Sequence, residues 1–235
     1  MADFRKTAWS PAGPRPHLLI PLDDETRSSV GRALYPILGR WTHLIKPVPL
    51  DNLHITLAWA DVPSDSISAG QWDKAVRHIE HQLLRTPAFQ ISLGPALVTR
   101  DGVRLDVTCQ PPEGMEYFAG QAGMLMRRGF GFAAGDVRVK DPYTPHCSLA
   151  YTYTDTPVPG ELGSELIKAR DDDGLRMPRM RLAVKQVLLV AQDTYTDPAP
   201  DDGDQWPYRW SRETYFPLQL RAADSIAMGL DDDLW

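Results

Sequence analysis

A short pattern that occurs twice limits what this 235-residue chain can fold into. The stretches NLHITLAWAD (52–61) and TPHCSLAYT (144–152) both contain His, any residue, Thr or Ser, Leu, Ala and an aromatic residue, in that order. Each stretch has the length and the apolar content of one β-strand. A lone His-x-Thr carries little weight, but a joint match in two apolar strands is hard to attribute to coincidence. The repeat therefore predicts one shared functional site, formed by two similar halves of the chain.

Strand geometry sorts the residues of each copy into two faces, because successive side chains point to opposite sides. One face carries the imidazole, the hydroxyl and a very small residue: His54, Thr56 and Ala58 in the first copy, and His146, Ser148 and Ala150 in the second. The small residue leaves room, as the floor of a cleft would. Strict alternation turns Trp59 and Tyr151 towards the core, where they pack, unless a bulge turns them into the cleft to stack on bases.

The polar face of the two strands is suited to acid-base chemistry on a phosphate. Two imidazoles that face each other across a cleft both titrate near neutral pH, so one can accept a proton while the other donates one. The hydroxyls beside them can hydrogen-bond the non-bridging oxygens of a phosphate group. We therefore expect phosphodiester chemistry, with His54, Thr56, His146 and Ser148 as the catalytic residues.

The composition is that of an ordinary globular protein, with 43% hydrophobic and 24% charged residues. The net charge of −6 argues against broad binding to duplex DNA through its phosphates, but not against a small anionic ligand. No run of about 18 apolar residues occurs, and the first residues lack the apolar core of a signal peptide. We expect a cytoplasmic monomer without a membrane partner, in which Cys109 and Cys147 are reduced.

Hydrophobic periodicity and turn residues predict the element order β-α-β-α-β-β-α-β-α-β-β. Strands joined by a hairpin at Asp101-Gly102 favour an α+β fold with largely antiparallel sheets over a doubly wound parallel sheet. The main body is expected to span residues 17–220, after a flexible arm (1–16) and before a mobile acidic tail (221–235). Helices are expected from residue 23 or 24, over 70–86, after Pro111 or Pro112 and over 160–169, with strands over 17–22 and 181–193 and a last strand near 212–220.

The paired motif resembles the 2H phosphoesterase superfamily, in particular its bacterial branch called 2′-5′ RNA ligase or RNA 2′,3′-cyclic phosphodiesterase. IPLDDETRSSV, PLDNLHITLAWAD, TPHCSLAY and VKQVLLVAQD carry the resemblance, which covers roughly residues 17–220. It implies a two-lobed fold with pseudo-twofold symmetry and a central cleft. It also implies metal-independent hydrolysis, without a cofactor, of a 2′,3′-cyclic phosphate or a 2′-5′ linkage in a nucleotide or RNA end. His146 would act as base and His54 as acid, while Thr56 and Ser148 would hold the phosphate.

The chain departs from this family at one position. Members often carry Arg directly after the Leu-Ala of the second motif, where this chain has Tyr151. Lys140, Arg138 or Arg100 could compensate for the missing cation. His17 occupies a position where relatives often have a cleft aromatic residue, so it either stacks on a base or is a surface histidine at a strand end. The residues expected to bind substrate are His17, Lys140, Tyr143 and Tyr151.

Other functions remain open on the sequence alone. The same cleft could hold a nucleotide without turning it over, as a non-catalytic binding module. A metallohydrolase could use the two motif histidines with a nearby Asp, although we expect no metal in the site. His78 and His81 lie away from the apolar stripe of their helix, which favours solvated residues over a metal site. Alternation sends Cys147 to the face opposite His146, which favours a core cysteine over a thiol nucleophile.

Overall fold

A computed structural model describes residues 13–140, 142–152, 158–169, 180–194 and 208–219. Residues 1–12 of the expected arm, and the whole expected acidic tail, lie outside the described residues. The first strand begins at Arg15, two residues inside the segment expected to be an arm. No helix in the described part of the chain has the length and apolarity needed to cross a bilayer.

The helices and strands expected from the sequence are present in the expected order, with two short strands added and one expected strand divided, and the fold is α+β. Strands and helices follow in the order β1 (Arg15–Pro21), α1 (Asp24–Gly39), β2 (Ile45–Pro47), β3 (His54–Ala60), α2 (Ala69–Leu83), β4 (Phe89–Thr99), β5 (Gly102–Cys109), α3 (Gly114–Phe130), β6 (Val137–Arg138), β7 (His146–Thr152), α4 (Gly160–Lys168), β8 (Met180–Val184), β9 (Gln186–Thr194) and β10 (Tyr208–Pro217). Among the described residues, short 3₁₀ turns lie at Leu50–Asn52, Ser64–Ser66 and Ala134–Asp136.

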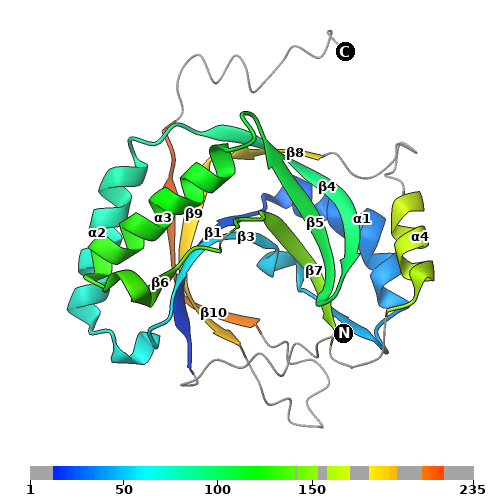
Figure 1. Ribbon diagram of the computed structural model, residues 1–235, viewed down its shortest axis with the longest axis horizontal. Coiled ribbons are helices and arrows are strands. Elements are labelled where there is room, and N and C mark those ends of the chain that lie inside the picture. Colours follow the sequence, from blue (N-terminus) through cyan, green and yellow to red (C-terminus); the bar gives the residue numbers. More distant parts are fainter. Residues whose placement is uncertain (1–12, 141, 153–157, 170–179, 195–207, 220–235) are drawn as a thin grey trace.

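The described strands form one antiparallel sheet that is shared by both lobes. Its main order is β10-β9-β1-β3-β7-β5-β4-β8, while β2 pairs with β7 and β6 pairs with β3. Figure 1 shows this sheet curled into a half-barrel, with α2 and α3 beside one half and α1 and α4 beside the other. The helices of each pair contact each other, and α3 also packs on β3 while α4 packs on β4. The two lobes are therefore the two halves of one curled sheet.

Local sequence explains where the covering helices begin and which side they bury. The carboxylate of Asp23 accepts a hydrogen bond from the Thr26 amide at 2.8 Å and caps α1. Ser68 and Gln71 form a reciprocal capping box at the start of α2. Both helices then bury an apolar stripe at helical spacing: Val30, Leu34 and Leu38 in α1, and Trp72, Ala75, Ile79 and Leu83 in α2. Trp72 of this stripe packs on Phe130 of α3.

The pseudo-twofold symmetry expected from the repeated motif is visible in the strand pairing. The two motif strands, β3 and β7, meet in the middle of the sheet through a single antiparallel pair, Ile55 with Cys147. At its far end β3 is joined by the short strand β6, and β7 is joined in the same way by β2. The two strands also share one burial pattern along their seven residues. The symmetry axis therefore passes close to the Ile55–Cys147 pair, which places the two motifs around it.

Two expectations about strands were wrong in detail. The turn between β4 and β5 consists of Arg100 and Asp101, because Gly102 already pairs with Thr99. The segment expected to be one strand over 181–193 forms two strands that divide at Lys185. β8 pairs with β4 in one half of the sheet, and β9 pairs with β1 and β10 in the other. Lys185 and Gln186, which are both exposed, interrupt the apolar pattern at this point, but they do not show that the pairing partner changes.

Candidate active site

A cleft of about 680 Å³ lies on the concave side of the sheet, where β1, β3, β5, β7 and β9 all contribute lining residues. All eight residues expected from the sequence line it: His54, Thr56, His146 and Ser148 as catalytic residues, and His17, Lys140, Tyr143 and Tyr151 as substrate-binding residues. Its volume lies within the range of about 300–1,000 Å³ that is typical of ligand sites. Side chains that are far apart in sequence therefore share one hollow of the size of a small ligand.

The central strand pair brings the two motifs together. In an antiparallel pair, the residues that flank a bridged pair lie crosswise opposite each other. The pairing of Ile55 with Cys147 therefore sets His54 across from Ser148, and Thr56 across from His146. The two imidazoles are close enough that the charge of His146 lowers the pKa of His54. Each histidine thus lies beside the hydroxyl of the opposite motif.

Both motif histidines are held in one orientation by matching hydrogen bonds. The Nδ1 atom of His54 lies 2.7 Å from the Asn52 carbonyl oxygen, and the Nδ1 atom of His146 lies 2.8 Å from that of Thr144. A carbonyl oxygen only accepts, so Nδ1 carries the hydrogen in each ring. The neutral tautomer therefore has its lone pair on Nε2, the nitrogen that can exchange a proton with a ligand.

Burial favours the neutral form of both imidazoles. Desolvation lowers the pKa of His54 from 6.5 to about 4, and the hydrogen bond to Asn52 opposes this only in part. The pKa of His146 is also lowered, mainly by burial and further by the charges of Lys140 and Arg104. The hydrogen bond to Thr144 and the charge of Asp106 act in the opposite direction. An anion bound between the rings would favour the protonated forms.

A bulge in each motif strand overturns the expected alternation. Consecutive residues of β1, Leu18 and Leu19, pair with Ala58 and Thr56 of β3, so β3 skips one residue. In the same way, Val103 and Arg104 of β5 pair with Ala150 and Ser148 of β7, so β7 also skips one residue. The skip turns Trp59 and Tyr151 to the side of the histidines, where both line the cleft. Ala58, expected at the cleft floor, is instead fully buried in the core and does not line the cleft.

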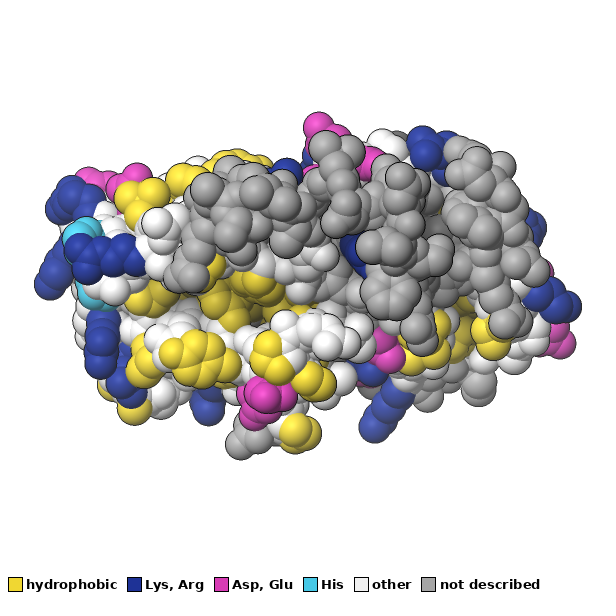
Figure 2. Space-filling view, turned by 90° about the horizontal axis from the view of Figure 1, so that it is seen from above, with side chains coloured by type: hydrophobic (Ala, Val, Ile, Leu, Met, Phe, Trp, Pro, Cys, Tyr) yellow, Lys and Arg dark blue, Asp and Glu magenta, His cyan; other side chains and the backbone are white. Residues whose placement is uncertain are grey.

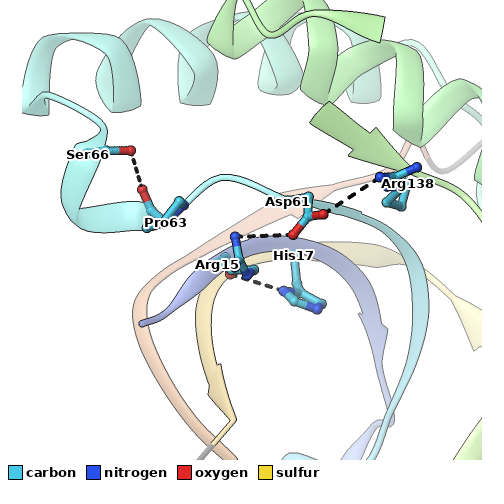
Figure 3. Close-up of polar contacts among 6 residues, drawn as sticks. All are labelled: Arg15, His17, Asp61, Pro63, Ser66 and Arg138. Carbon is cyan, nitrogen blue, oxygen red and sulfur yellow. Dashed lines mark hydrogen bonds and ion pairs between the residues drawn. The ribbon is translucent and has the colours of Figure 1, made fainter. Parts of the chain in front are cut away.

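A third histidine lies in the same hollow. His17 on β1 is only 4% exposed, and its Nδ1 lies 3.0 Å from the Arg15 carbonyl oxygen. Its ring is nearly parallel to that of Trp59, at 15°, with centroids 6.4 Å apart. Figure 3 shows the His17 ring projecting beneath the strand, away from the ion pairs of Asp61 with Arg15 and Arg138. His17 is therefore a buried cleft residue, and its alternative assignment as a surface histidine was wrong.

Burial also lowers the pKa of His17, from 6.5 to about 3, and the nearby His54 lowers it further. His17 and Trp59 thus form a neutral, flat wall on the β1 side of the cleft. Gln192 on β9 lines the same side and is 3% exposed. Among the residues that the structure describes, its buried Oε1 has no hydrogen-bond partner. The sequence reasoning missed Gln192, which follows directly after the apolar run Val187–Ala191 of β9.

The cleft lining also includes cations. Lys140 and Arg100, two of the cations expected to compensate for Tyr151, line the cleft. The third, Arg138, does not line it and instead pairs with Asp61 at 3.7 Å. Arg104 on β5 lines the cleft as well, although the sequence reasoning missed it. The alternation in VRLDVTC could have found it, because Val103, Leu105 and Val107 take the core face and leave Arg104 on the other.

Two further contacts hold the motif strands in place. The Tyr143 hydroxyl donates a hydrogen bond of 2.9 Å to the backbone carbonyl of Thr56, so it ties the segment before β7 to β3. Gly102 lies against β7 with a φ of +147°, and a Cβ there would lie 2.0 Å from the Ala150 carbonyl oxygen. Only glycine fits such a close approach in this conformation. Tyr143, expected to bind substrate, therefore also has a positioning contact.

The residues discounted in the sequence lie away from this chemistry. Cys147 is fully buried, and burial raises the pKa of its thiol to about 12, so it stays protonated. On α2, His81 is exposed and His78 is half-buried. Figure 2 shows histidine among Lys and Arg side chains at the end of the molecule that carries α2. Within the described ranges, no three His, Cys, Asp or Glu side chains gather as metal ligands.

Comparison with known proteins gives one family and one fold. The model of the family described as the 2′-5′ RNA ligase superfamily matches residues 32–193. LigT of E. coli, solved with 3′-AMP, has a TM-score of 0.55 and 21% identity, over 87% of this chain and 98% of that one. TT0787 of Thermus thermophilus has a TM-score of 0.55 and 18% identity, over 88% and 99%. A crystal structure described as a phosphoesterase has a TM-score of 0.52 and 19% identity, over 88% and 99%. No curated protein matches the chain.

Proposed function

The chain belongs to the 2′-5′ RNA ligase superfamily, and on that premise we propose that it is a metal-independent phosphodiesterase acting on a nucleotide or an RNA end. Its substrate would carry a 2′,3′-cyclic phosphate or a 2′-5′ phosphodiester. The observation that carries this proposal is the matched pair of imidazoles, each fixed through Nδ1 and each beside the hydroxyl of the other motif. Hydrolysis of a phosphodiester needs a general base and a general acid on either side of the phosphorus, and two oriented imidazoles in one cleft can supply both.

The reaction requires one proton to be taken and another to be given. One imidazole removes a proton from water as the water oxygen attacks phosphorus. The bond between phosphorus and a ribose oxygen breaks, and the second imidazole protonates that oxygen as it leaves. The products are a phosphomonoester and a free ribose hydroxyl. The hydroxyls of Thr56 and Ser148 donate hydrogen bonds to the non-bridging oxygens, where charge develops.

The environments of the two imidazoles favour an assignment of roles that is the reverse of the one implied by the resemblance. The pKa of His54 is lowered to about 4 by burial, so its Nε2 keeps a lone pair at neutral pH and suits a general base. His146 has a more exposed hydrogen bond, and the Asp106 carboxylate opposes the lowering of its pKa by burial. A bound phosphate anion favours its protonation further. We therefore assign His54 as the base and His146 as the acid.

The lining of the cleft supports a nucleotide as the substrate. The flat wall formed by His17 and Trp59 offers a surface on which a base can stack. Lys140 and Arg100, which also line the cleft, complement a phosphate group. LigT, a relative by fold, has been solved with 3′-AMP, with ATP and with NADP⁺, which are all nucleotides. The base would then lie on the β1 side, with the phosphate between the motif histidines.

Turnover of a 2′,3′-cyclic nucleotide, followed by separation of the monophosphate products, tests the proposal. Replacing His54 or His146 with Ala should each lower kcat by about 10²- to 10⁴-fold, the usual contribution of a general acid or base. His43→Ala, at an exposed histidine outside the cleft, is the matched control and should leave kcat unchanged. A chelator should also leave the rate unchanged. Activity that survives both cleft substitutions would refute the catalytic assignment. If wild type binds the cyclic nucleotide tightly but does not hydrolyse it, the protein is a nucleotide-binding module instead.

A further inference from the structure

The motif strands themselves supply no positive charge to the phosphate. β3 reads HITLAWA and β7 reads HCSLAYT, so neither contains Lys or Arg. A phosphodiester carries one negative charge, and the charge on its oxygens rises as water attacks. Hydroxyl groups stabilise such charge less well than a guanidinium, which donates two parallel hydrogen bonds to a phosphate. The cation that binds the phosphate must therefore come from a neighbouring element.

Arg104 is the cation that the sheet itself places beside the motif. In the pairing of β5 with β7, Arg104 lies opposite Ser148 and Asp106 lies opposite His146. Paired residues of adjacent strands present their side chains on the same face, so Arg104 extends beside the hydroxyl expected to hold the phosphate. It lines the cleft together with both motif histidines.

Asp106 is the ion-pair partner of this guanidinium. The Nε atom of Arg104 lies 3.2 Å from Oδ1 of Asp106, which is an ion-pair distance without hydrogen-bond geometry, and the two side chains are 26% and 32% exposed. Because the carboxylate is contacted through Nε, both Nη groups can donate to a second anion. A cation fixed in advance, and partly removed from water, loses little freedom when a phosphate binds.

The other cations of the cleft are less well placed. Arg100 lies in the turn between β4 and β5, and Lys140 follows β6, and both are exposed. Neither of these positions belongs to a strand beside β7. The charges of Lys140 and of Arg104 both lower the pKa of His146, so the strand register, and not this charge effect, distinguishes Arg104.

We propose that Arg104, positioned by Asp106, binds the phosphate of the substrate and stabilises the charge that develops on it. This assignment rests on the proposed function and adds its phosphate-binding residue. It also explains how the chain can carry Tyr151 where related sequences often have an arginine, because the cation enters from β5 instead of β7.

The test compares Arg104→Leu and Arg104→Lys with wild type in kcat/KM for a 2′,3′-cyclic nucleotide and in Kd for inorganic phosphate. Arg104→Leu should lower kcat/KM by about 10²-fold or more, the usual effect of losing one transition-state donor, and should weaken phosphate binding. Arg104→Lys keeps the positive charge but lacks the planar guanidinium group. Its kcat/KM and its Kd for phosphate should therefore lie between those of wild type and Arg104→Leu. Arg138→Leu removes another ion-paired strand arginine, outside the cleft lining, and is the matched control.

Arg104→Lys keeps the test decisive if Arg104→Leu folds poorly, and a rescue variant adds a second readout. Arg104→Leu with Tyr151→Arg supplies the cation from β7, and recovery of at least tenfold in kcat/KM would support the assignment. If wild type hydrolyses no cyclic nucleotide but Arg104→Leu and Arg104→Lys both weaken phosphate binding, the proposed function fails and the phosphate site stands. If folded Arg104→Lys and Arg104→Leu keep wild-type kcat/KM and Kd, the assignment of Arg104 is overturned and the proposed function stands.

Discussion

Replacing His17 with Phe should make the protein less sensitive to acid. The pKa of His17 is lowered from 6.5 to about 3, first by burial and then by the charges of neighbouring His54 and Arg15. The unfolded chain therefore binds a proton at His17 at a pH where the folded chain does not. The stability that the folded protein gains by keeping His17 neutral is fully present above pH 6.5. It is lost progressively as the pH falls towards 3. Each pH unit in that window costs up to about 1.4 kcal/mol, so His17 removes about 2 kcal/mol of stability between pH 6.5 and pH 5.

Urea unfolding at several pH values between 7.5 and 4.5 measures this effect. Phe keeps a flat ring beside Trp59 but cannot be protonated, so the free energy of unfolding should fall less steeply with acid than in wild type. His17→Gln is the second variant, because it can still donate to the Arg15 carbonyl. The two variants can differ in stability at pH 7.5, yet they should share the same shallower pH dependence. Curves that run parallel to wild type would refute the claim that the folded protein keeps His17 neutral.

Three other outcomes follow from the site. The kcat/KM for a 2′,3′-cyclic nucleotide should be highest on the acid side of neutrality: it should fall below about pH 4 as His54 gains a proton, and fall again as His146, with its pKa below 6.5, loses one. A plateau that extends to pH 8 would contradict this. Gly102→Ala should lower both the thermal midpoint and kcat/KM, because its Cβ would lie 2.0 Å from a backbone oxygen of β7, and an unchanged midpoint would show that the strands are not so close. Tyr143→Phe should cost about 1 kcal/mol of stability in urea unfolding, through loss of the hydrogen bond to Thr56, and a variant as stable as wild type would exclude that contact.

Much of the scaffold could be predicted because it follows from local periodicity. The apolar stripe through Val30, Leu34 and Leu38 identified α1, and a polar cap identified its start. The repeated motif identified the two central strands and, through its symmetry, the halves of the sheet. The expected fold class and family are confirmed. These features depend on short-range patterns of the kind that a single sequence displays.

The features that could not be predicted depend on how strands pair. Trp59 and Tyr151 enter the cleft only because one residue is skipped in each motif strand. The residue types of these strands do not reveal such a bulge. Lys185 divides one extended segment between two halves of the sheet. Alternation in VRLDVTC could have assigned Arg104 to the face opposite the core, but its place beside Ser148 follows from the register of β5 on β7. The roles of the cleft residues stay predictions until they are tested.

A crystal structure with a nucleoside 3′-monophosphate, the product class of the proposed reaction, tests the central claim most directly. We predict that the phosphorus lies between the two imidazoles, with phosphate oxygens within hydrogen-bond distance, about 2.7–3.2 Å, of both Nε2 atoms. The hydroxyls of Thr56 and Ser148 should contact the same phosphate group. A phosphate that contacts only one of the two histidines, or that binds outside the cleft, would contradict the account.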